Sequence, residues 1–240
     1  MKILITGATS GIGQQVAMDY ASAGHQVIAC GRNQDKLDAM AKLNNMQTLA
    51  FDVSDPQACA QQLKPLQGLD VVILSAGVCE YVDDAKHFES ALVERVFQAN
   101  FFGMLYCAEA LLPQLEAGAK LVFIDSMSRL LPFTRAEAYG ASKAATFYFA
   151  KSLAVDLADQ GIQVVTVSPG FVKTPMTDAN DFKMPMRIGV EAASQALRQQ
   201  LDAGKSTIYF PRRFGWMLRF MNKLPTALQL KIVSRMKDSQ

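Results

Sequence analysis

A tyrosine followed four residues later by a lysine is the arrangement in this sequence best suited to proton transfer. Tyr139 and Lys143 have this spacing, which on a helix places both side chains on one face, one turn apart. A free phenol has a pKa of about 10, too high for acid–base chemistry near neutral pH. A neighbouring ammonium group favours the phenolate, so the pair predicts a tyrosine with a lowered pKa that can exchange a proton.

Ser126 lies 13 positions before Tyr139, directly after an apolar run. Its hydroxyl can donate a hydrogen bond to a substrate carbonyl oxygen and stabilise the charge that grows there during a reduction. A serine at a strand end and a Tyr–Lys pair on a helix are each common structural features. None of the other five tyrosines is followed by lysine at this distance, and the combination of the three residues favours catalysis.

The amino-terminal segment has the composition of a loop that binds phosphate. It comprises Gly7, Ala8, Thr9, Ser10, Gly11, Ile12 and Gly13, between an apolar run and a helical pattern. Glycines there let the backbone approach a pyrophosphate, and the following helix supplies free N–H groups and the positive end of its dipole. The spacing Gly-x-x-x-Gly-x-Gly differs from the common Gly-x-Gly-x-x-Gly of dinucleotide folds, and Gln14 stands where a P-loop needs lysine. A glycine-rich turn without a ligand is the alternative.

Gly31 and Arg32 end the second apolar run, about 20 residues beyond the glycines. Proteins that bind NAD normally place Asp or Glu near this point to hold the ribose 2′-hydroxyl. An uncharged residue removes the repulsion of a 2′-phosphate, and a guanidinium can bind that phosphate with two N–H bonds. The segment therefore favours NADP(H) over NAD(H), unless Arg32 is an ordinary solvated charge at a strand end.

Short apolar runs alternate with helical patterns along the chain. Strands are expected at 2–6, 26–30, 47–51, 70–75, 120–125, 163–168 and 207–210, and helices at 11–23, 34–43, 55–64, 88–115, 137–160 and 190–203. Several of the strands are apolar throughout, which is typical of a parallel sheet buried on both faces. The pattern predicts a Rossmann-type, doubly wound α/β fold with about seven parallel strands and helices on both faces.

The composition excludes several other classes of protein. Half of the 240 residues are hydrophobic, which argues against disorder. The four cysteines are far apart, as expected of reduced thiols in a cytoplasmic enzyme rather than of disulfides. No His, Cys and carboxylate spacing suggests a metal, and no Gly-x-Ser-x-Gly elbow suggests a serine hydrolase. The amino terminus is too short for a signal peptide, and no apolar stretch approaches the ~20 residues that span a bilayer.

Taken in order, these motifs resemble those of the short-chain dehydrogenase/reductase family over roughly residues 1–210. The matching pieces are the run from Thr6 to Gly13, Asp52-Val53, Ser75-Ala76-Gly77, Asn100, Ser126, Tyr139 with Lys143, and Pro169-Gly170-Phe171-Val172-Lys173-Thr174. The family usually has Asn where Ser75 stands. Because serine can still form local hydrogen bonds, the change predicts a small loss of stability and not an inactive site.

The resemblance implies a function and a set of site residues. The expected catalytic residues are Ser126, Tyr139, Lys143 and Asn100, with Asn100 organising a water relay to Lys143. The residues implied to bind the cofactor are Gly7, Thr9, Ser10, Gly11, Ile12, Gly13, Arg32, Asp52, Val53, Ala76, Gly77, Tyr139, Lys143, Pro169, Val172 and Thr174. The resulting expectation is an NADP(H)-dependent oxidoreductase that moves a hydride between the nicotinamide and an alcohol or carbonyl compound. A nucleotide-sensing or scaffold protein on the same fold is the alternative.

Two segments that should flank the nicotinamide are rich in soft apolar side chains. They contain Met127, Leu130, Leu131, Pro132 and Phe133, and Met176, Phe182, Met184 and Met186. A pocket lined by methionine adapts to irregular apolar ligands, which predicts a small apolar carbonyl or alcohol substrate. The same residues would equally suit a lid or a core without substrate contact.

The carboxyl-terminal end differs in charge from the rest of the chain. Residues 203–237 contain eight Lys or Arg and no Asp or Glu, whereas the remainder has 16 basic and 22 acidic residues. We expect residues 1–210 to form the catalytic domain, with a substrate loop at 170–190, and residues 211–240 to form a basic amphipathic tail. The apolar side chains of the tail fall into two sets on either side of Pro225.

Three roles are open for this tail. It can cover the substrate cleft, contact another subunit, or lie on an anionic membrane surface at the inner face of a membrane. No basic stripe interleaved with aromatics elsewhere suggests nucleic acid. Apolar residues beyond one face of the two long helices (Phe101, Phe102 and Leu105; Phe147, Tyr148 and Phe149) predict a homodimer or homotetramer, as the resemblance also implies.

Overall fold

The central sheet of the protein contains seven parallel strands. The computed structural model describes residues 1–237. The strands are β1 (Lys2–Thr6), β2 (Gln26–Gly31), β3 (Met46–Ala50), β4 (Val71–Leu74), β5 (Lys120–Ile124), β6 (Gln163–Pro169) and β7 (Thr207–Phe210). Their order in the sheet is β3-β2-β1-β4-β5-β6-β7. The order reverses between β1 and β4, and the predicted Rossmann-type fold is confirmed.

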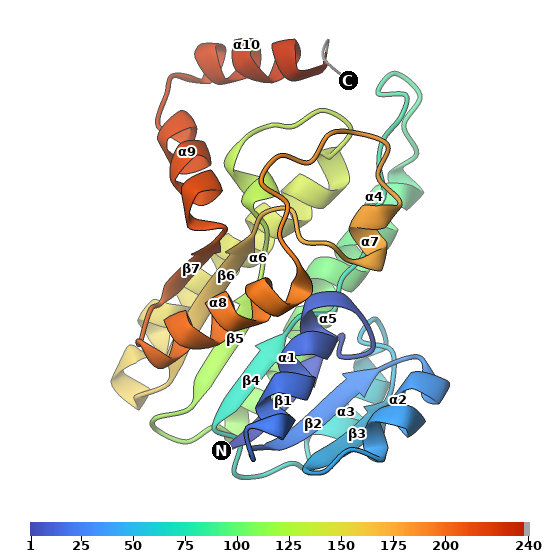
Figure 1. Cartoon of the computed structure of the whole chain (residues 1–240), viewed down its shortest axis with the longest axis vertical. Helices are drawn as coiled ribbons and strands as arrows, with labels where there is room; N and C mark the ends of the chain where they lie inside the picture. The colour runs from blue at the N-terminus through green and yellow to red at the C-terminus, as the bar shows by residue number, and fades with distance from the viewer. Residues whose placement is uncertain (238–240) are drawn as a thin grey trace.

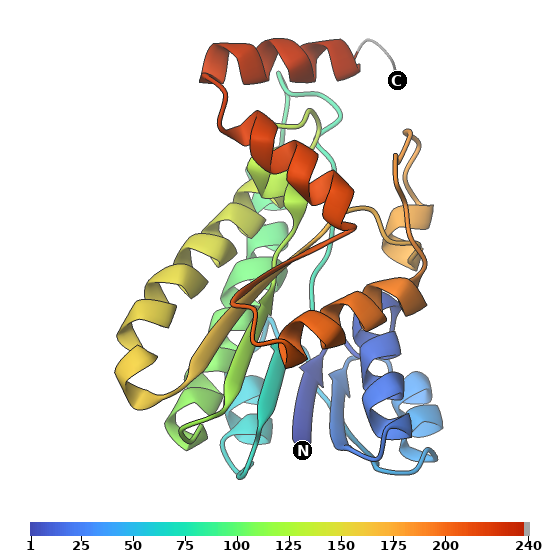
Figure 2. The same ribbon diagram turned by 60° about the vertical axis from the view of Figure 1, so that its left-hand side comes forward.

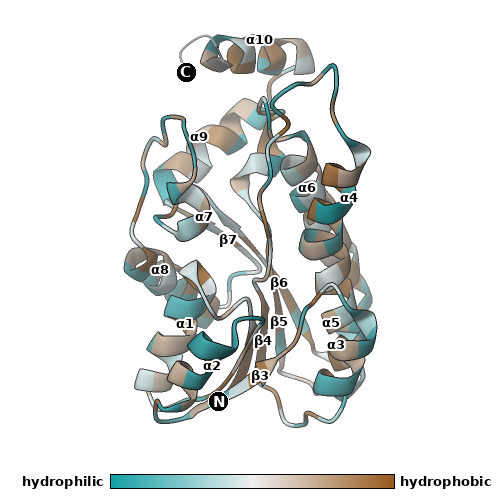
Figure 3. Ribbon diagram, turned by 90° about the vertical axis from the view of Figure 1, so that its right-hand side faces the viewer, coloured by the Kyte–Doolittle hydropathy of each residue, from teal (hydrophilic) through white to brown (hydrophobic). Residues whose placement is uncertain are grey.

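Helices cover both faces of this sheet (Figure 1 and Figure 3). The helices are α1 (Gly11–Ser22), α2 (Gln34–Ala41), α3 (Pro56–Leu63), α4 (Ser90–Phe97), α5 (Gly103–Leu111), α6 (Glu137–Asp156), α7 (Pro175–Asp178), α8 (Val190–Asp202), α9 (Arg212–Asn222) and α10 (Thr226–Lys237). Side chains of α1, α2 and α8 form one core with the sheet, and those of α3, α5 and α6 form the second. Strands such as β4 are buried on both faces, as their apolar sequence predicted.

The prediction of one long helix at 88–115 is wrong in detail. Its middle is a π-helical turn at Gln98–Phe102, between α4 and α5. Helix α5 ends at Leu111 because Pro113 follows, and proline cannot continue an α-helix. The periodicity of apolar residues indicates a helix but does not reveal one extra residue in a turn, so the interruption could not be predicted.

The tail forms the two helices that its apolar pattern predicted, α9 and α10, joined at Pro225. They lie beyond the carboxyl ends of the strands, with α10 at one end of the molecule (Figure 1 and Figure 2). Residues 238–240 of the predicted tail lie outside the described residues. Within the described part of the chain, no helix is long and apolar enough to cross a membrane. The domain division at residue 210 stays a prediction.

Candidate active site

Two cavities meet at the carboxyl ends of the strands. The larger, of about 550 Å³, is the nucleotide crevice; it runs from the turn after β1 to β6. The smaller, of about 330 Å³, is the apolar cavity, and it is bounded on one side by α9 and α10. Ser126 and Tyr139 line both cavities. The junction between the two spaces is therefore formed by two of the residues that the sequence singled out.

The nucleotide crevice collects the whole set of residues expected to bind a cofactor, from Gly7 to Thr174. Gly7 has a φ of +68°, and a Cβ there would be 2.8 Å from the backbone of Ala76. Only glycine allows so close an approach of the two turns that follow β1 and β4. The first N–H groups of α1 follow at Gly11, so the crevice has a backbone cradle that fits a pyrophosphate.

The end of β2 is built without room for an acidic residue. A Cβ at Gly31 would be 2.6 Å from Cγ2 of Thr9, so Asp or Glu there requires Thr9 to move. Arg32 follows, and its side chain is 68% exposed. Its Nη1 atom lies 3.3 Å from Oδ2 of Asp52, which is itself 42% exposed. The guanidinium therefore stands at the mouth of the crevice, held by a weak, solvated ion pair that a phosphate can replace.

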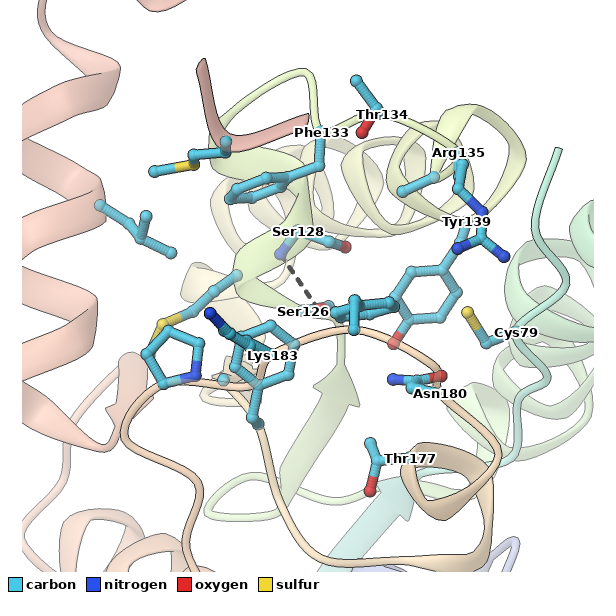
Figure 4. A pocket seen from close by; sticks show the side chains of 18 of the residues that line it. Cys79, Ser126, Ser128, Phe133, Thr134, Arg135, Tyr139, Thr177, Asn180 and Lys183 are labelled. Carbon is cyan, nitrogen blue, oxygen red and sulfur yellow. Dashed lines mark hydrogen bonds between the residues drawn. The ribbon is translucent and has the colours of Figure 1, made fainter. Parts of the chain in front are cut away.

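Ser126, Tyr139 and Lys143 are positioned by β5 and the first two turns of α6. Ser126 follows β5 and its Oγ accepts a hydrogen bond from the backbone N–H of Ser128 at 3.1 Å (Figure 4). Lys143 is 4% exposed, and its Nζ donates to the backbone carbonyl of Ile124 at 3.0 Å. That nitrogen lies 5.8 Å from the centroid of the Tyr139 ring. The three side chains thus converge at the junction of the cavities.

The expectation that Lys143 lowers the pKa of Tyr139 is wrong for the polypeptide alone. Burial raises the pKa of the Tyr139 phenol, the thiol of Cys79 adds to the rise, and a hydrogen bond with Ser126 opposes it. Burial also lowers the pKa of Lys143 to about 8, although the charge of Asp125 favours the ammonium form. Desolvation outweighs the charge of the lysine here, and the phenol holds its proton at neutral pH.

Asn100 lies beside the site and not on the crevice wall. It is fully buried in the π-helical turn at Gln98–Phe102. Its Oδ1 accepts from the backbone N–H of Val78 at 2.7 Å, and its Nδ2 donates to the carbonyl of Val78 at 2.9 Å and to Oγ of Ser142 at 3.0 Å. The side chain therefore ties the segment after β4 to α6, which fixes Ala76 and Gly77 along the crevice.

A buried ion pair beside Ser126 escaped the sequence-based prediction. Nε of Arg129 lies 3.4 Å from Oδ1 of Asp125, and both side chains are almost fully buried. Arg129 also donates to Oγ of Ser168 at 3.2 Å and to the hydroxyl of Tyr209 at 2.9 Å. Burial raises the pKa of Asp125 to about 6, against the opposing effect of Arg129. The burial of Arg129 was not predicted, because burial of a cation has no signal in local sequence.

The apolar cavity contains part of the set expected to contact substrate. Met127, Phe133, Met176 and Phe182 line it, whereas Leu130 and Leu131 are core residues. Pro132, Met184 and Met186 do not line it. Three further wall residues, Cys79, Tyr81 and Asn180, were not predicted, and the hydroxyl of Tyr81 donates to Oδ1 of Asn180 at 2.9 Å. Figure 4 shows Tyr139 among these polar groups on one side of the cavity.

Two further arginines near the apolar cavity, Arg135 and Arg187, are paired with carboxylates. Arg135 lies 2.8 Å from carboxylate oxygens of both Asp83 and Asp181. Arg187 pairs with Asp178 in the loop that follows β6. These ion pairs tie the predicted substrate loop at 170–190 to itself and to the segment after β4. The wall of the cavity is mostly apolar; its charged members are Arg135 and Lys183, and its uncharged polar members include Tyr139 and Ser126.

Comparison with known proteins agrees with this geometry. A family model described as short chain dehydrogenase matches residues 1–184. An uncharacterized oxidoreductase of Myxococcus xanthus (strain DK1622) is 30% identical over 236 residues, which cover 94% of this chain and 93% of the relative. An Arabidopsis thaliana protein named 11-beta-hydroxysteroid dehydrogenase-like 2 is 28% identical over 243 residues, covering 93% of this chain and 77% of that protein.

A solved structure gives the same fold. A short chain dehydrogenase from Burkholderia cenocepacia J2315, in complex with NADP, has a TM-score of 0.86 at 19% identity, over 97% of each chain. The family model and the Myxococcus relative establish that the chain belongs to the short-chain dehydrogenase/reductase family. It is an NAD(P)-dependent oxidoreductase that acts on CH–OH and C=O groups.

Proposed function

We propose that the protein is an NADP(H)-dependent reductase of apolar carbonyl compounds, with Tyr139 as the proton donor. The observation that carries the proposal is the position of Tyr139 and Ser126, on the wall shared by the nucleotide crevice and the apolar cavity. A carbonyl group at this junction would face the crevice on one side and these two hydroxyls on the other. A protonated phenol suits the reduction step, in which tyrosine gives its proton to the carbonyl oxygen.

Each of the catalytic residues has a separate part in this scheme. The hydroxyl of Ser126 donates a hydrogen bond to the substrate oxygen and stabilises the charge that develops there. Tyr139 gives its proton to the same oxygen, while the bound NADPH supplies the hydride. The buried ammonium of Lys143 stabilises the phenolate that remains. Asn100 holds the Val78 segment against α6, and we assign it a positioning role rather than contact with substrate.

Replacement of Tyr139 by phenylalanine tests the proposal. We expect the variant to bind NADPH as the wild type does and to reduce ketones about 10²–10⁴-fold more slowly, because general acid catalysis contributes that much. Turnover of a ketone panel and calorimetric titration with NADPH give the two readouts. Tyr148→Phe is the matched control, since Tyr148 is 79% exposed on the same helix and lines neither cavity. Undiminished turnover in Tyr139→Phe would remove this residue from the mechanism.

The wild-type enzyme also distinguishes the proposal from a protein that only senses nucleotide. Such a protein binds NADP(H) without turning over any member of the panel. The conjunction of Ser126, Tyr139 and Lys143 at the cavity junction supports an enzyme, because binding of a nucleotide requires no proton donor facing a second, apolar cavity.

The preference for NADP(H) is part of the proposal. It is supported by the exposed Arg32, by the crowding that leaves no room for an acidic side chain at Gly31, and by the NADP complex of the Burkholderia relative. Arg32→Ala is expected to weaken NADPH binding by about tenfold or more and to leave NADH binding unchanged, because only NADPH has a 2′-phosphate. Dissociation constants for both cofactors give the comparison.

A nearby cation provides the control for this experiment. Lys36 is exposed on α2 and does not line the crevice, so Lys36→Ala removes a positive charge without removing a predicted ligand. Equal losses for NADH and NADPH in Arg32→Ala, or an equal loss for NADPH in Lys36→Ala, would contradict a specific contact with the 2′-phosphate.

We further propose that residues 1–210 form the catalytic unit, that the tail covers the substrate cavity, and that the enzyme is a homodimer or homotetramer. Phe214, Leu218 and Val233 of the tail pack on Met127 and on Leu130, which supports the covering role. The four cysteines are free thiols in the structure, which supports the expected cytoplasmic location.

A further inference from the structure

The helices α9 and α10 have two chemically different faces. Their inner face contains Phe214, Leu218 and Val233, which are buried beside the apolar cavity. On the outer face, large apolar side chains are exposed: Trp216 by 74%, Phe220 by 60%, Leu230 by 53% and Leu228 by 43%. The covering role of the tail accounts for the inner face only, so the outer face requires its own explanation.

Basic residues are exposed on the same part of the chain. The exposed cations are Arg212, Arg213, Arg219, Lys223 and Lys231. No acidic residue occurs between 203 and 237, and among the described residues none of the five takes part in an ion pair. The guanidinium of Arg219 lies over the ring of Tyr209, 5.0 Å from its centroid. This contact does not neutralise the charge of the arginine. The exposed surface of α9 and α10 thus combines large apolar side chains with five cations and, among its described residues, no acidic side chain.

We propose that the outer face of α9 and α10 binds the surface of an anionic phospholipid bilayer. Tryptophan and phenylalanine are stable at the boundary between head groups and acyl chains, and arginine and lysine are attracted by anionic head groups. The exposed Leu228 and Leu230 add to the apolar surface, and the hydrocarbon of a bilayer can bury them. The helix α10 lies at one end of the molecule, so a flat surface can reach it (Figure 1 and Figure 2).

Two other occupants fit the outer face less well. A second copy of this chain, docked through the same face, would place five cations against five, and the like charges would repel. A nucleic acid would satisfy the cations and could stack on Trp216, but it has no hydrocarbon to cover Leu228 and Leu230. Both occupants are outcomes that the following experiment separates from a bilayer.

The single tryptophan of the chain, Trp216, reports directly on this surface. The full-length protein is mixed with phosphatidylcholine vesicles that contain or lack phosphatidylglycerol, at low salt. With the anionic vesicles we expect a blue shift of Trp216 emission and quenching by brominated phosphatidylcholine, both reversed at high salt. Pure phosphatidylcholine vesicles should produce neither change. Because fluorescence is the readout, the result does not depend on whether the proposed reductase activity exists.

Variants separate the contributions of charge and of apolar contact. Arg212→Ala with Arg213→Ala should lower partitioning onto anionic vesicles about 20-fold, because each basic residue near the surface contributes about fivefold. Phe220→Ala should lower it as well and reduce the blue shift. Lys42→Ala with Lys64→Ala is the matched charge control and Phe88→Ala the matched aromatic control. All three control positions are exposed and lie outside α9 and α10, so these variants should bind as the wild type does.

Several results would overturn the proposal. One is unchanged Trp216 emission with anionic vesicles, for a wild-type protein whose circular dichroism shows that it is folded. Others are an equal shift with pure phosphatidylcholine, or equal loss of binding in the control variants. Protection of Trp216 by duplex DNA, or by self-association detected in sedimentation, without a response to vesicles would assign the surface to those partners.

Discussion

At the scale of single residues, the site contains two buried ionisable groups, and burial disfavours the charged form of each. Lys143 and Asp125 are 4% and 1% exposed, and burial moves the pKa of each toward its neutral form, to about 8 and about 6. Each favours the charged form of the other. Charges of this kind are rarely kept in a protein interior for stability, and their place beside Tyr139 indicates that they serve its chemistry.

The pKa of Lys143 predicts how ketone reduction depends on pH. The ammonium form is needed to stabilise the phenolate, and it is complete well below pH 8 and lost as the pH rises through about 8. The phenol, whose pKa is raised, stays protonated over the same range. We therefore expect kcat/KM to be level from pH 6 to 7 and to fall above pH 8. A steady-state profile measures this, and a level profile up to pH 10 would show that the charge of Lys143 is not required.

At the scale of elements, the interruption of the helix between α4 and α5 determines where Asn100 lies. The π-helical turn at Gln98–Phe102 brings the whole side chain of Asn100 to the segment after β4. A regular helix over the same residues would rotate the following turn by one position and move Asn100 from Val78. The π-helical turn therefore lets Asn100 link α6 to the segment after β4, which lines the crevice.

Removal of the Asn100 side chain should be costly for stability. Asn100→Ala loses three hydrogen bonds and leaves buried partners unpaired, so we expect a loss of about 2–4 kcal/mol in the free energy of unfolding. Asn33→Ala is the control, because Asn33 caps α2 through one hydrogen bond and its loss should cost about 1 kcal/mol. Urea denaturation of both variants provides the comparison. Equal losses would mean that the network adds nothing to an ordinary cap.

Features that depend on local sequence could be predicted, whereas features that depend on contacts between distant residues could not. The apolar strands, the glycine turn and the Tyr–Lys spacing are local patterns. They predicted the sheet, and the residues expected to bind the cofactor all line one crevice. The hydrogen bonds of Arg129 to Ser168 and Tyr209, and that of Tyr81 to Asn180, join residues 39 to 99 positions apart. The rise in the pKa of Tyr139 was not predicted for a related reason, since burial is a property of the folded chain.

At the scale of the whole molecule, α6 presents an uncharged stripe to solvent. Its exposed positions include Ala141, Ala144, Tyr148 and Val155, with Tyr148 79% and Val155 76% exposed. Phe102, at the start of α5, is 41% exposed as well. An apolar stripe of this length on a helix suggests contact with another subunit, consistent with the proposed homodimer or homotetramer.

Charge introduced into this stripe should dissociate the oligomer. We expect the wild type to sediment as a dimer or tetramer, and Tyr148→Glu with Val155→Glu to sediment as a monomer, because burial of two carboxylates in an apolar interface is unfavourable. Trp216→Glu should leave the assembly intact, since Trp216 lies on the tail. A monomeric wild type would contradict the predicted assembly, and dissociation by Trp216→Glu would move the interface to α9.

The attachment of the two tail helices to the sheet is unequal. A Cβ at Gly215 would lie 2.9 Å from Cβ of Tyr209 and 3.0 Å from Cε of Met127, so α9 is seated directly on β7. In α10, Val233 is the residue buried in the same cluster. We therefore expect a bulky ligand to displace α10 more readily than α9 or the strands. Variation in α10 offers a way to broaden or narrow the range of accepted molecules while the proton donor stays in place.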